Sequence, residues 1–88
     1  MQSVKAPQMT RVQKLQWYVN QLMQDAAAAE KSGNSEVAVK AYLNASDILL
    51  LLSKAEENYI AWKNYTDKAE YCHQKAKMLI ATRPAPPL

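Results

Sequence analysis

The sequence predicts an all-α fold, arranged as an up-down-up three-helix bundle. Its 88 residues include one glycine and no phenylalanine and are rich in Ala, Leu, Lys, Gln and Glu. These side chains lose little rotamer freedom in a helix. In three separate segments the apolar residues recur at spacings of three and four, which is the period of one helical face. A chain of this length is expected to form one domain.

The first helix is expected over roughly residues 10 to 32. Gly33 follows it and can adopt the left-handed conformation that closes a helix. Asn34 or Ser35 can then accept a hydrogen bond from the free amides at the start of the next helix. The apolar face of the first helix comprises Val12, Leu15, Val19, Leu22, Ala26 and Ala29.

The second helix carries an apolar surface wider than one stripe, because Leu50 and Leu51 add to it. A helix that is apolar on so many sides needs two neighbours. No Gly or Pro marks its end, and we place the break near residues 53–58, where Ser, Glu and Asn gather. Its core positions are predicted to be Ala38, Ala41, Tyr42, Ala45, Ile48, Leu49 and Leu52.

The third helix is expected to end before Pro84, because a residue that precedes proline is disfavoured in the α region. The short corner at Gly33 makes the first two helices antiparallel, and the third helix then lies beside both. We expect Cys72 to be a small buried hydrophobe. The core stripe of this helix comprises Trp62, Tyr65, Ala69, Cys72, Ala76 and Leu79.

The chain divides into three parts. Residues 1–9 are expected to form an N-terminal extension, residues 10–82 the helical domain, and residues 83–88 the start of a proline-rich linker. Proline-rich segments cannot continue a helix and behave as semi-rigid spacers. We therefore expect an N-terminal domain of a larger protein.

Catalytic chemistry is not indicated. His73 is the single histidine, and Cys72 beside it points about 100° away around a helix, so the two do not form a dyad. Asp67, Glu70 and His73 share a helix face, but we favour a solvated surface over a metal site. The acidic residues Asp25, Glu30, Glu56 and Glu57 are interpreted as solvated in the same way. We expect no enzyme, no cofactor and no metal.

Charge and hydropathy narrow the choice of partners and compartment. The net charge is +3, but no cluster of four or more Lys or Arg occurs, which argues against nucleic-acid binding. The longest apolar run, residues 48–52, is far shorter than the roughly 20 residues that span a bilayer. A single cysteine favours a reducing compartment. We expect a cytoplasmic protein that meets membranes only indirectly.

Two motifs carry a resemblance to a known family. Residues 29–45 fit the pattern A-x-x-x-G-N-x-x-x-A-x-x-x-Y-x-x-A of a helical hairpin, which tetratricopeptide repeats and MIT domains share. A tetratricopeptide array needs a second copy about 34 residues on, and none is present. The segment Tyr65-Thr66-Asp67-Lys68-Ala69-Glu70 is similar to Y-L-D-[KR]-A-E in the third MIT helix of the vacuolar-sorting AAA ATPase. The chain therefore resembles the MIT (microtubule-interacting and trafficking) family.

The resemblance implies a peptide-binding adaptor that recruits its parent protein to ESCRT-III-like subunits at endosomal or other membrane-remodelling sites. The expected ligands are short C-terminal segments of those subunits. Family members use a groove between helices 2 and 3, matched here by Thr66, Asp67, Glu70 and His73, or a groove between helices 1 and 3. Thr66 stands where the family has a leucine. The side of the third helix that would face helix 2 is polar. The side that would face helix 1 has an aromatic ring and a methionine, with two lysines beside them. We favour the second groove, with Asn20, Met23, Ala27, Lys68, Tyr71, Lys75 and Met78.

Two alternatives stay open. The first is a self-association or scaffold module in which Leu50, Leu51 and Trp17 form a homodimer face. The second is a membrane-surface or nucleic-acid binder that uses the scattered lysines. The isolated domain is expected to be a monomer.

Overall fold

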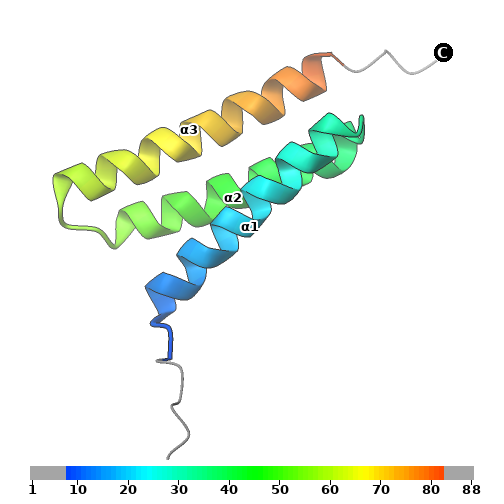
Figure 1. Cartoon of the computed structure of the whole chain (residues 1–88). Coiled ribbons are helices and arrows are strands. Elements are labelled where there is room, and N and C mark those ends of the chain that lie inside the picture. Colours follow the sequence, from blue (N-terminus) through cyan, green and yellow to red (C-terminus); the bar gives the residue numbers. More distant parts are fainter. Residues whose placement is uncertain (1–7, 83–88) are drawn as a thin grey trace, which may run out of the picture.

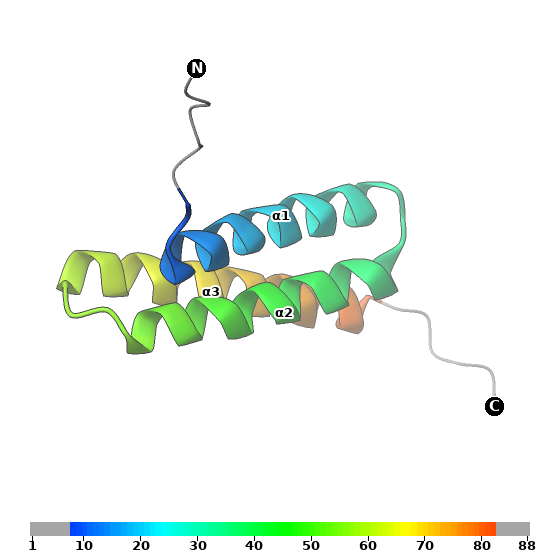
Figure 2. The ribbon, with the colours of Figure 1, turned by 90° about the horizontal axis from the view of Figure 1, so that it is seen from below.

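The computed structural model describes residues 8–82 as three α-helices (Figure 1). Helix α1 spans Arg11–Lys31, α2 spans Ser35–Lys54 and α3 spans Tyr59–Ala81. The α1–α2 and α2–α3 connections lie at opposite ends of the bundle (Figure 2), which confirms the up-down-up order. The predicted linker and most of the predicted N-terminal extension lie outside the described residues.

The residues at the helix ends adopt the conformations and make the capping hydrogen bonds that the sequence predicts. Gly33 has a φ of +83°, the left-handed conformation that any residue with a Cβ rarely adopts. Asn34, and not Ser35, caps α2, since its side chain accepts a hydrogen bond from the Val37 amide at 3.3 Å. The break after α2 falls at residues 55–58, and there Asn58 caps α3. These caps satisfy amides that no helical carbonyl can reach.

Helix α2 is the centre of the molecule and packs on both α1 and α3. Seven of the thirteen buried hydrophobic residues among the described ones are alanines, so the helix axes can approach closely. Cys72 is fully buried, as predicted. The core comprises Val19, Ala26, Ala29, Ala38, Val39, Ala41, Tyr42, Ala45, Leu49, Leu52, Ala69, Cys72 and Ala76.

Two predicted core positions are wrong. Val12 is 45% exposed and Trp62 is 42% exposed. Each lies in the first turn of its helix, at the end of the bundle away from the α1–α2 corner, and Val12 lines an open hollow there with Leu52 and Ala55 of the α2 end. Trp62 stacks on Tyr59 instead, with ring centroids 5.9 Å apart.

The α2–α3 interface contains three buried positions that the apolar stripes did not predict: Val39, Ser46 and Ser53. They are spaced seven residues apart and so share one face of α2. The Ser46 hydroxyl donates to the Ala69 carbonyl across the interface at 3.2 Å, and the Ser53 hydroxyl donates to the carbonyl of Leu50 at 2.7 Å. The buried hydroxyls are therefore satisfied, and their small size lets α2 and α3 pack closely.

Candidate functional site: the trough between α1 and α3

Helices α1 and α3 pack on each other far more weakly than either packs on α2. Two side-chain cross-links connect them. The Gln16 amide donates to the Tyr65 hydroxyl at 2.7 Å, and the Lys75 ammonium donates to the Glu30 carboxylate at 2.8 Å. We call the face between these cross-links, with α1 and α3 at its sides and α2 beneath, the trough; the hollow that all three helices line lies at its Gln16–Tyr65 end.

The floor of the trough is apolar and its rim is polar. A pocket of about 200 Å³ opens beside the Gln16–Tyr65 cross-link. Leu49 and Leu52 form its base and are almost fully buried against the core. Asn20 from α1 and Lys68 from α3 are exposed on opposite walls. The full lining is Gln16, Val19, Asn20, Leu49, Leu52, Tyr65 and Lys68.

The other end of the trough is closed by a polar cluster that joins all three helices. Glu30 of α1 accepts hydrogen bonds from the Tyr42 hydroxyl at 2.9 Å and from Lys75 at 2.8 Å. The expectation that Glu30 is a solvated end residue is wrong, because its side chain is only 30% exposed and both carboxylate oxygens have partners. The cluster therefore bridges this end of the trough, and the charges of Glu30 and Lys75 neutralise each other.

The pKa values in this cluster shift in the directions that its geometry dictates. The hydrogen bond from Lys75, and then that from Tyr42, lower the pKa of Glu30 below its ordinary value. Burial, and then the hydrogen bond to Glu30, raise the pKa of Tyr42. The hydrogen bond to Glu30 raises the pKa of Lys75. All three shifts keep Glu30 and Lys75 charged and Tyr42 neutral at physiological pH.

The seven residues predicted for this groove lie at several places along α1 and α3. Asn20 and Lys68 line the same pocket. Met23 is half-buried and packs against the core, and Ala27 is exposed beside a shallow hollow next to Glu30. The remaining three belong to α3: Tyr71 packs edge-to-face on Tyr42, with centroids 6.5 Å apart, Lys75 forms the ion pair, and Met78 is exposed.

The groove between α2 and α3 holds three of the four alternative residues. Thr66, Glu70 and His73 line one pocket of about 310 Å³ together with Ser46, Leu50, Ala69 and Gln74. Its α2 wall includes Leu50, so this groove is less polar than the α3 residues alone indicated.

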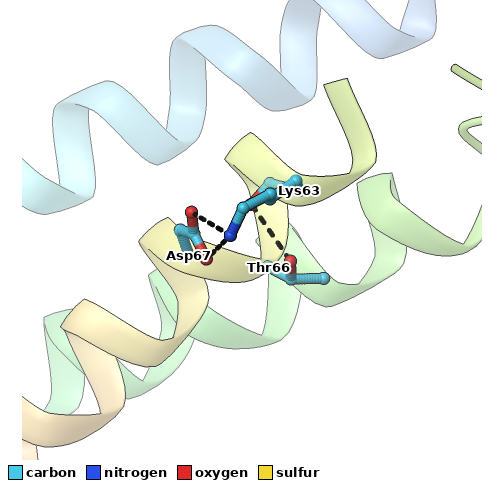
Figure 3. Close-up of polar contacts among 3 residues, drawn as sticks. All are labelled: Lys63, Thr66 and Asp67. Carbon is cyan, nitrogen blue, oxygen red and sulfur yellow. Dashed lines mark hydrogen bonds and ion pairs between the residues drawn. The ribbon is translucent and has the colours of Figure 1, made fainter. Parts of the chain in front are cut away.

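The fourth residue, Asp67, points elsewhere. It forms an exposed ion pair with Lys63 at 3.2 Å (Figure 3). The Thr66 hydroxyl donates to the Lys63 carbonyl at 3.0 Å and is satisfied within α3.

Chemistry at the single cysteine is suppressed by its environment. Burial raises the pKa of the Cys72 thiol, which disfavours the reactive thiolate.

Within residues 8–82, no group of three or more His, Cys, Asp or Glu side chains could hold a metal ion. Over the same range, no helix combines the length and the apolar character needed to cross a membrane.

Sequence reasoning missed the cross-links that define the trough. Gln16 and Tyr65 are 49 residues apart, and Glu30 and Lys75 are 45 apart, so no local pattern connects them. The one sequence signal for them is the helical period, which places Gln16, Asn20 and Ala27 on one flank of α1.

Comparisons with protein-family models, curated proteins and solved structures gave no match.

Proposed function

We propose that this domain is a non-catalytic, MIT-like adaptor that binds a short peptide segment in the trough between α1 and α3. The observation that supports it is the trough itself, in which two side-chain cross-links bridge helices that otherwise pack weakly, above a base formed by Leu49 and Leu52. Grooves between helices with an apolar base and polar rims are a recurring mode of peptide recognition.

The cross-links bridge the two sides of the trough in the absence of a ligand. A preformed groove reduces the entropy lost on binding, because the ligand orders and the protein does not. Within residues 8–82, Lys68 forms no ion pair, whereas Lys75 is paired with Glu30. Lys68 is therefore the trough lysine available to an acidic side chain of the ligand, beside the pocket at whose base Leu49 and Leu52 lie.

The resemblance to the MIT family supplies the proposed partner. The ligand would be an extended, proline-containing segment near the C-terminus of an ESCRT-III-like subunit, and binding would bring the parent protein to membrane-remodelling polymers in the cytoplasm. A small groove and a ligand that orders on binding favour a weak single-site affinity.

A capture assay with a panel of ESCRT-III C-terminal peptides tests the proposal. Lys68→Glu and Tyr71→Asp are expected to abolish capture of a peptide that the unmodified domain binds. Lys68 is exposed, so Lys68→Glu should keep the circular dichroism and the stability of the parent, whereas Tyr71→Asp also removes the ring contact with Tyr42 and needs a melt beside the capture assay. Met23 is a poorer probe because it packs against the core, and a charge there would also destabilise the fold.

Two controls separate the grooves. Lys14→Glu makes the same change in net charge on a part of α1 away from the trough, and it should leave binding intact. Glu70→Lys changes the α2–α3 pocket and should also be silent. If Glu70→Lys abolishes capture while Lys68→Glu and Tyr71→Asp are silent, the ligand lies between α2 and α3. If no peptide in the panel binds, the proposed partner class is wrong.

A further inference from the structure

The outer face of α2 carries a regular stripe that no helix of this chain covers. Its positions have the 4-3-4-3-4 spacing of a coiled-coil seam, but two are apolar and four are charged, and all of them are exposed. They lie on the side of α2 opposite the buried face that forms the trough floor. This outer stripe comprises Glu36, Lys40, Leu43, Asp47, Leu50 and Lys54.

The charges on the outer stripe are balanced and ordered. The two acidic and two basic residues sum to zero, which gives no attraction to anionic lipid or nucleic acid. None of the four forms an ion pair within residues 8–82. Glu36 is at one end and Lys54 at the other, with Leu43 and Leu50 between them. Leu51, which is 56% exposed, flanks the stripe.

When a second copy of the outer stripe runs in the opposite direction, its charges are complementary to those of the first. If two copies of α2 lie antiparallel with Ala45 of each at the crossing point, Glu36 of one copy lies opposite Lys54 of the other. The twofold axis generates the same contact a second time, between Lys54 of the first copy and Glu36 of the second. Lys40 then lies three residues, about 4.5 Å along the axis, from Asp47 of the other copy, within reach of a lysine side chain. Leu43 lies equally near Leu50 of the other copy. A parallel pair would place like charges opposite each other at every charged position.

We propose that two copies of this chain associate through the outer stripes of α2, antiparallel and about a twofold axis. Self-association of this kind is isologous, so each copy uses the same surface. Leu50 is covered in the pair, which obstructs the α2–α3 pocket, whereas both α1–α3 troughs face outward. The inference does not depend on what the trough binds, but a dimer with two open troughs would engage a polymeric partner with avidity.

Sedimentation velocity over a rising concentration series tests this directly. The unmodified domain is expected to show a reversible monomer–dimer equilibrium. Glu36→Lys and Lys54→Glu should each raise the dimer dissociation constant by about tenfold or more, because each turns two attractive pairs into two repulsive ones. The double variant Glu36→Lys/Lys54→Glu restores opposite charges and should recover dimerisation.

The recovery distinguishes a specific antiparallel pair from loss of folding or non-specific association, and circular dichroism of each variant provides a second check. Trp17→Ser is the matched control, since Trp17 is 57% exposed on α1, away from the outer stripe. A sedimentation coefficient that stays monomeric at the highest concentration overturns the proposal. So does a dimer that Trp17→Ser disrupts, or one that neither charge reversal weakens.

Discussion

Glu30 is the residue whose environment differs most from its sequence context. It follows a run of four alanines near the end of α1, where a carboxylate is ordinarily solvated. In the folded chain it accepts hydrogen bonds from α2 and α3 at once, through Tyr42 and Lys75. One carboxylate therefore joins all three helices.

This cluster predicts how stability depends on pH. The pKa of Glu30 is lower in the folded state than in the unfolded chain, where it is about 4.3. The stabilisation from Glu30 is therefore complete above that value and is lost as the pH falls through the lower, folded pKa. At pH 7 Glu30→Gln should lower the free energy of unfolding by about 1 kcal/mol, and the difference should shrink below about pH 5.

Urea unfolding of the two proteins between pH 7 and pH 3 measures this difference. Tyr42→Phe removes one of the two hydrogen bonds to Glu30 and should give an intermediate dependence on pH. A difference between Glu30→Gln and the unmodified chain that is constant across the range would contradict the cluster.

At the scale of the helices, close packing by small residues determines how α2 fits between its neighbours. Ala38 and Ala45 are fully buried on α2, and Ala69 and Ala76 are buried on α3. The spacing of the alanines was sufficient to predict which face of each helix is buried. The burial of Ser46 and Ser53 could not be predicted in this way, because a serine is neutral in an apolar pattern and its role depends on a carbonyl in another helix.

Ala45 tests this packing. Ala45→Leu inserts a larger side chain where α2 meets its neighbours, and the overpacking should lower the free energy of unfolding by about 1 to 3 kcal/mol. The matched control is Ala28→Leu on the exposed face of α1, which should change stability by less than about 0.5 kcal/mol. Chemical melts of both variants provide the comparison, and equal midpoints would show that Ala45 is not at a close helix approach.

At the scale of the whole molecule, the helix order, the Gly33 corner and most of the core follow from sequence patterns. These features depend on contacts within one helix or across one short turn. The candidate site depends instead on residues that three helices bring together. Asn20 and Lys68 were predicted for the α1–α3 groove and do line one pocket, but its floor, Leu49 and Leu52, was assigned to the core alone.

The sequence pattern also does not show which lysine of α3 is free to bind a ligand. Lys68 and Lys75 lie on the same flank of α3 and are equivalent in the sequence pattern. In the fold, Lys75 meets Glu30 and Lys68 meets no carboxylate within the described residues. Which of two similar charges is available to a ligand is decided by tertiary contacts, so a helical pattern cannot distinguish them.

The measurement that most directly tests the central claim is a nuclear magnetic resonance titration of the domain with a proline-containing ESCRT-III C-terminal peptide. Backbone amide signals of residues along the α1–α3 trough, including Asn20, Lys68 and Tyr71, should shift in proportion to the bound fraction. Signals of Thr66, Glu70 and His73, which face the α2–α3 pocket or lie beside it, should move little. Shifts confined to these last three residues, or no shift with any peptide of the panel, would contradict the trough as the binding site.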